Sequence, residues 1–142
     1  MSHFVDILTE ITDQKALVRA LERMGFKGHV ESYDHTVTIY GYLGDERPEK
    51  AHVVIRKQYV GPSSNDIGFE KKADGKFVAH ISEYDMGEGE YSHRKAPYGE
   101  AWQKKLYQLY GVEKSKMEFE NKGWTYVEDV DEKNRPRLRV RL

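Results

Sequence analysis

Residues 36–84 contain four short segments that decide the fold: TVTIYGYL (36–43), AHVVIRKQYV (51–60), DIGFEKK (66–72) and GKFVAHISEY (75–84). In the first segment, one side of the strand would carry Val37, Ile39 and Leu43 and the other side Thr38, Tyr40 and Tyr42. In the last segment, one side would carry Phe77, Ala79 and Ile81 and the other side Val78, His80, Ser82 and Tyr84. A period of two predicts strands of a sheet whose two faces differ in chemistry. One face is predicted to be core, and the other carries tyrosine and histidine.

Turn-forming residues separate these segments. The stretches GDERPEK (44–50) and GPSSND (61–66) are predicted to be loops because they combine glycine and proline with polar residues. Asp74-Gly75 is a strong hairpin signal between the last two segments. Residues 27–41 are predicted to form another hairpin, with Asp34-His35 near its turn. The longest loop without a repeating pattern is expected at 85–97.

Two amphipathic helices flank the strands. The first is predicted from about Asp13 to Met24, because Thr12 or Asp13 can cap it and apolar residues recur at helical spacing before Gly25. The second is predicted from about Tyr98 to Lys122, with Gly123 ending it. A strand is predicted within residues 2–11, and a closing hairpin from 125–130 and 137–142.

The order of these elements predicts an α+β fold, an antiparallel sheet of about five to seven strands with two helices packed on one face. The length of 142 residues indicates a single domain, 1–142. A formal net charge of -1 gives no global electrostatic argument for nucleic acid or membrane. The chain has no cysteine, no apolar run near the roughly 20 residues of a membrane span and no visible secretory signal. We therefore expect a cytoplasmic protein that does not bind membranes.

Several short motifs occur in an order that resembles one family. They are MSHF (1–4), ALERMGF (20–26), VVIR (53–56), DIGF (66–69), LYQLYG (106–111) and a final GW-YVE hairpin (123–128). The family is a domain of unknown function encoded in algal plastid genomes as a hypothetical conserved reading frame, in cyanobacteria, and in some other bacteria and phages. The resemblance covers nearly the full length and supports a single domain, but it carries no catalytic residues over to this chain. Its presence in phages is compatible with a small accessory or counter-defence protein.

The polar face of the predicted sheet is the first candidate binding surface. It comprises Tyr40, Tyr42, His52, Arg56, His80, Ser82 and Tyr84. Tyrosine and arginine are favoured at binding hot spots, and residues 85–97 are placed to act as a lid over the edge of this face. The alternative is that the face simply meets water, since tyrosine is also a good strand former.

A row of arginines in the last strand is the second candidate. Arg135, Arg137, Arg139 and Arg141 alternate with other residues, which places their guanidinium groups on one face about 7 Å apart. Such a row suits phosphates or an acidic protein. The favoured alternative is cross-strand pairing with the acidic residues Glu128, Asp129, Asp131 and Glu132.

Other site chemistry has little support in the sequence. The six histidines form no compact metal-binding pair, so no metal site is predicted. No serine elbow, catalytic cysteine or phosphate-binding glycine loop occurs, so we predict neither catalytic residues nor a cofactor. The leading hypothesis is a non-catalytic binding module for a protein partner, another copy of itself or a nucleotide-like ligand. A nucleic-acid-binding protein that uses the arginine strand is the second hypothesis, and a small enzyme is the third.

Overall fold

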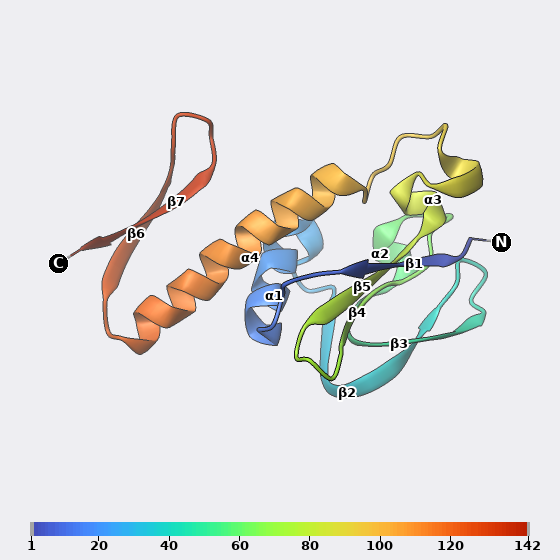
Figure 1. Ribbon diagram of the computed structural model, residues 1–142, viewed down its shortest axis with the longest axis horizontal. Helices are drawn as coiled ribbons and strands as arrows, with labels where there is room; N and C mark the ends of the chain where they lie inside the picture. The colour runs from blue at the N-terminus through green and yellow to red at the C-terminus, as the bar shows by residue number, and fades with distance from the viewer. Residues whose placement is uncertain (1, 142) are drawn as a thin grey trace.

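The fold consists of a sheet, the helices that cover it and a C-terminal hairpin (Figure 1). The computed structural model describes residues 2–141, so Met1 of the MSHF start and Leu142 of the predicted last strand lie outside the described residues. The elements are β1 (Phe4–Leu8), α1 (Gln14–Leu21), the π-helical turn η1 (Glu22–Phe26), β2 (Val30–Tyr40), β3 (Glu46–Ile55), α2 (Lys57–Val60), β4 (Ile67–Lys71), β5 (Phe77–Ser82), α3 (Glu83–Met86), the 3-10 turn η2 (Gly89–Tyr91), α4 (Glu100–Asn121), β6 (Thr125–Val130) and β7 (Pro136–Arg141).

The predicted α+β class is confirmed. Within residues 2–141, the main sheet has five antiparallel strands in the order β1-β5-β4-β3-β2, and β6 pairs only with β7 in a separate hairpin. The closing hairpin is therefore formed as predicted, but it is not an extension of the main sheet. Figure 1 shows it rising from the C-terminal end of α4, outside the rest of the fold.

One face of the main sheet forms the core beneath α1 and α4. The face is continuous because paired residues of an antiparallel sheet point to the same side: Val53 pairs with Phe69, and Phe69 pairs with Ala79. Leu17 of α1 and Leu106 of α4 belong to the same buried cluster. The prediction of two long helices on one face is therefore confirmed.

Helix α1 begins where its sequence predicts, but it ends at Leu21, three residues before the predicted Met24. The Asp13 carboxylate accepts a hydrogen bond from the Ala16 N–H at 3.1 Å, which satisfies one of the free donors of the first turn. The helical path continues through η1, where Gly25 has a φ of 105° that glycine adopts without a Cβ clash.

The predicted hairpin around Asp34-His35 is wrong, because residues 30–40 form a single strand. Ser32 pairs with Val53, and the next pair is Val37 with Ala51. The chain therefore advances five residues along β2 but only two along β3 between these pairs. The extra residues bulge outward, and the exposed Asp34 and His35 lie in this bulge. A polar cluster that resembles a turn thus bends the strand and does not reverse it.

The predicted loop at 44–50 is also wrong in its second half, because β3 starts at Glu46. Thr38 pairs with Lys50 and Tyr40 with Glu46, so β3 carries extra residues between these two pairs. Pro48 lies in this irregular part, where a missing N–H donor is tolerated. The loop between β2 and β3 is confined to residues 41–45.

Two predicted strands stop earlier than expected. Strand β3 ends at Ile55, because the Asp66 carboxylate accepts from the Lys57 N–H at 2.8 Å and supports the start of α2. Strand β5 ends at Ser82, whose hydroxyl accepts from the Asp85 N–H at 3.1 Å and caps α3. Tyr84 therefore lies in α3 and not on the sheet face where it was predicted.

The second face of the sheet is covered in its centre by the outer part of the β2–β3 ribbon. Ile39 and Ala51 from that ribbon form a small buried cluster with Val54. They lie directly over Gly68 of β4, because a Cβ added at Gly68 would be 2.8 Å from the Ala51 Cβ and 3.2 Å from the Ile39 Cδ1. The close approach of the ribbon therefore depends on the missing side chain at position 68.

Gly68→Ala is predicted to lower the free energy of unfolding by about 1–3 kcal/mol, because the added methyl group overpacks a stiff backbone contact. The control is Gly111→Ala on α4, where an added Cβ meets nothing within 4 Å and alanine favours the helix by about 0.5–1 kcal/mol. Urea denaturation measures both variants. A double variant with Ala51→Gly should recover part of the loss, and equal stability of the Gly68→Ala variant and the parent would contradict the close approach.

Candidate functional site

The two histidines of the predicted sheet face are used inside the fold. His80 is 2% exposed, and its ring lies between the carboxylates of Asp6 at 2.7 Å and Glu70 at 3.0 Å. Burial raises the pKa of Glu70, but its bonds with His80 and Lys72 outweigh that effect and leave the pKa below its ordinary value. His52 is half-buried, and its Nδ1 accepts a hydrogen bond from the Lys71 N–H at 3.0 Å. Burial lowers the pKa of His52. Both rings therefore make hydrogen bonds within the fold.

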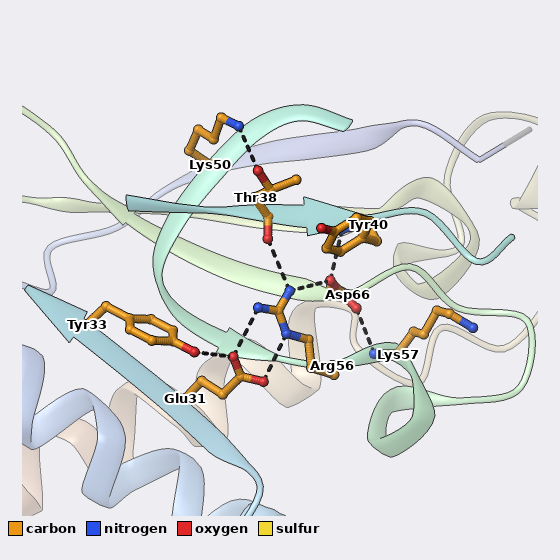
Figure 2. Close-up of polar contacts among 8 residues, drawn as sticks. All are labelled: Glu31, Tyr33, Thr38, Tyr40, Lys50, Arg56, Lys57 and Asp66. Atoms are coloured by element: carbon orange, nitrogen blue, oxygen red, sulfur yellow. Dashed lines mark hydrogen bonds and ion pairs between the residues drawn. The ribbon is translucent and has the colours of Figure 1, made fainter. Parts of the chain in front are cut away.

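Arg56 ties the bulged strand β2 to the loop before β4, as Figure 2 shows. Its guanidinium forms a two-point contact with the Glu31 carboxylate at 2.9 and 3.0 Å. It also donates to Asp66 at 3.0 Å and to the Thr38 carbonyl at 3.1 Å. Burial lowers the pKa of Arg56, but these carboxylates more than offset that and raise it above its ordinary value. Tyr40 lies beside this cluster, with the centre of its ring 5.8 Å from the Arg56 Cζ.

Of the remaining predicted face residues, Tyr42 donates its backbone N–H to the Asn65 side chain at 3.0 Å, and Tyr84 lies against the segment 85–97. The Arg94 guanidinium stacks 3.5 Å from the centre of the Tyr84 ring, so the segment folds back onto α3. Asp85 anchors it from within, since its buried carboxylate accepts from the hydroxyls of Ser64 and Ser82 at 2.9 and 3.0 Å. Burial raises the pKa of Asp85. The predicted sheet-face residues are thus divided among three separate places.

Neighbouring acids pair with three of the four arginines in the row. Arg137 and Arg139 both bond to Asp129 across the hairpin, and Arg135 pairs with Asp131 in the turn at 2.8 Å. The bonds from Arg137 and then Arg139 lower the pKa of Asp129 to about 2. Cross-strand pairing, the favoured alternative, is therefore what the structure shows for Arg137 and Arg139, whereas Arg135 pairs within the turn. Arg141 is exposed at the end of β7.

A basic cleft lies between α4 and the turn of the C-terminal hairpin. Its volume is about 690 Å³, and it is lined by Arg23, Lys104, Lys105, Gln108, Leu109, Val130, Lys133, Asn134, Arg135 and Pro136. Five of these side chains are basic and none is acidic. The lining also includes the apolar residues Leu109, Val130 and Pro136. A lining that combines cations with apolar groups suits an organic anion.

Three lysines give the cleft its positive charge. Arg23 and Arg135 are paired with carboxylates outside the lining, Arg23 with Glu113 and Glu128. No ion pair forms at Lys104, Lys105 or Lys133 within residues 2–141, and all three are exposed. Uncompensated charges on both walls of one cleft make a local positive field in a chain of nearly zero net charge.

A four-residue charge network fixes the hairpin beside α4 and thereby shapes the cleft. Arg23 contacts Glu113 at 2.8 Å and Glu128 at 2.7 Å, and Lys116 contacts the same two carboxylates at 3.1 and 2.5 Å. Burial raises the pKa of Glu128, but bonds from Arg23 and Lys116 more than offset this and hold the pKa below its ordinary value. The network joins η1, α4 and β6.

Sequence reasoning missed this cleft although part of its signal was visible. Lys104-Lys105 lies on the polar side of the predicted second helix, and Lys133 lies in the turn DEKNRP. Nothing in the sequence shows that the hairpin folds beside the helix, so these lysines read as ordinary solvated charges. Only Arg135 belongs to both the predicted arginine row and the cleft.

Comparisons of the chain with models of protein families, with curated proteins and with solved structures gave no match. The resemblance of its motifs to the plastid, bacterial and phage family therefore stays a prediction. In the described part of the chain, no helix combines the length and apolar character needed to cross a membrane. Residues 2–141 also contain no group of three or more histidine, aspartate or glutamate side chains placed to hold a metal ion.

Arg56→Met is predicted to lower the free energy of unfolding by about 3 kcal/mol, because it leaves the 2%-exposed Asp66 side chain without its cation. Arg137→Met removes an equally close pair with Asp129 from an exposed site, and it should change stability little. Urea denaturation of both variants checks the contrast. Equal losses would show that Arg56 does not hold the bulged strand in place.

Proposed function

We propose that this protein is a non-catalytic binding module that holds nucleic acid in the basic cleft between α4 and the C-terminal hairpin. The observation that carries the proposal is the lining of the cleft, with five basic side chains and no acidic one in about 690 Å³. Lysine and arginine bind the phosphates of nucleic acid, and this sequence-independent contact supplies most of the affinity in many such complexes.

The charges lie where a backbone of repeated phosphates would contact both walls. Lys104 and Lys105 project from α4, and Lys133 belongs to the hairpin turn on the other side. A single small anion needs fewer cations, whereas a nucleic-acid chain offers one phosphate after another. Since the net charge of the chain is only -1, the attraction is local and acts within about a Debye length, roughly 10 Å at moderate salt.

A binding role is favoured over catalysis by the same lining. The residues around the cleft supply cations, amides and apolar groups, but no histidine or carboxylate to serve as a general acid or base. The sheet face and the segment 85–97 have no part in this proposal, because Arg56, His80 and Arg94 make internal contacts.

The triple variant Lys104→Gln, Lys105→Gln, Lys133→Gln is predicted to lose most affinity for a labelled oligonucleotide at low salt. The plot of log K against log salt has a negative slope, and each lost phosphate contact should make it shallower by about 0.7 for a single strand. The slope of the triple variant should therefore be shallower than that of the parent by roughly 2. Fluorescence anisotropy across a salt series measures both quantities.

The matched control is Lys15→Gln, Lys71→Gln, Lys95→Gln, which removes the same charge from exposed positions outside the cleft. It should keep most of the affinity and the slope of the parent. Equal losses in the two triple variants would mean that only overall charge matters. No binding of any oligonucleotide by the parent at low salt would reject the proposed function.

A further inference from the structure

An exposed tryptophan lies at the other end of the hairpin that forms the cleft. Trp124 is 44% exposed, and it immediately precedes β6, whose last residue, Val130, lines the cleft. Its ring packs against Phe119 of α4 at 5.7 Å, and the Lys122 ammonium sits 4.5 Å from the ring centre. A base that stacks on this ring face takes the place of the Lys122 ammonium, which leaves the cation beside the ring for a phosphate.

We propose that the ligand of the cleft is single-stranded nucleic acid, and that Trp124 stacks on one of its bases. This inference rests on the proposed function and names the class of nucleic acid. Bases of a duplex are already stacked inside the helix, so a stacking side chain at the surface selects an unpaired strand.

The distance between the two contacts suits a short single strand. Strand β6 has six residues, which at about 3.3 Å each span roughly 20 Å from Trp124 to the cleft. Figure 1 shows this strand leaving the C-terminal end of α4, so both contacts lie on one structural arm made of the helix and the hairpin. Sites for single strands commonly cover about 4–16 nucleotides, and a strand of that length reaches both places.

The carboxylates between the two places do not repel such a strand strongly. Glu113 and Glu128 lie between Trp124 and the cleft, and both are paired with Arg23 and Lys116. The exposed carboxylate of Glu120 accepts from the Tyr126 hydroxyl at 2.8 Å and lies 3.8 Å from Arg19. The path between the aromatic ring and the basic cleft is thus close to neutral.

Trp124 also packs in an aromatic group with Phe119 and Tyr126, so its role is tested by a readout that packing alone would not move. The protein has two tryptophans, and Trp102→Phe leaves Trp124 as the only one. This variant is titrated with a thymidine oligonucleotide about eight nucleotides long, with an abasic backbone of the same length and with a duplex. Tryptophan emission and binding affinity are both recorded.

The expected result is that the thymidine strand quenches Trp124 emission and binds about fivefold or more tightly than the abasic backbone or the duplex. Trp124→Ala should weaken binding of the thymidine strand by about fivefold or more and leave the abasic backbone unchanged, while Trp124→Phe should retain most of the affinity.

Three outcomes would overturn the inference while leaving the proposed function intact. They are unchanged Trp124 emission at saturation, equal affinity for the thymidine strand and the abasic backbone, and an equal loss for both ligands in Trp124→Ala. The last outcome would assign Trp124 to packing of the hairpin alone. If the parent binds none of the three probes at low salt, the proposed function and the inference fall together.

Discussion

The close approach of the β2–β3 ribbon to Gly68 is the constraint on which the arrangement of the sheet depends. Because this position has no side chain, Ala51 and Ile39 pack onto the face opposite the helices and bury its centre. The neighbours of Gly68 make further contacts: Ile67 and Phe69 belong to the helix-covered core, and Asp66 binds Arg56. The tetrapeptide DIGF thus contributes contacts on both faces of the sheet, and the centre of the face opposite the helices is buried by the ribbon.

The parts of the fold that the sequence predicts are those set by local chemistry. Helical spacing with a capping Asp13 predicts α1, and Asp74-Gly75 predicts the turn between β4 and β5, where Gly75 has a φ of 85°. The wrong predictions concern strand boundaries that are set by residues distant in the sequence. Strand β2 continues through Asp34-His35 because β3 supplies a continuous partner, and β3 stops at Ile55 because Asp66 supports a new helix. Neither partner is visible in the local pattern.

The same division explains the candidate sites. Alternation in the last strand correctly predicts that Arg137 and Arg139 share a face, but Asp129, which lies opposite Arg137, forms ion pairs with both. His80 was expected on an open face, yet Asp6 and Glu70 enclose it. The cleft was not predictable, because Lys104 and Lys133 are distant in sequence and become neighbours only when the hairpin lies beside α4. Residue types were readable from the sequence, and their surroundings were not.

The position of the hairpin is therefore a functional question as well as a structural one. A two-stranded hairpin is marginally stable alone, so β6 and β7 depend on contacts with α4, such as Tyr126 against Phe119, and on the charge network that Arg23 makes with Glu128. Because the pKa of Glu128 is lowered in the folded protein, this stabilisation is present above the ordinary glutamate pKa and is lost as the pH falls through the lowered value. A ligand that contacted Lys104 and Lys133 together, as proposed for nucleic acid, would bridge α4 and the hairpin turn. By mass action it would stabilise the docked hairpin.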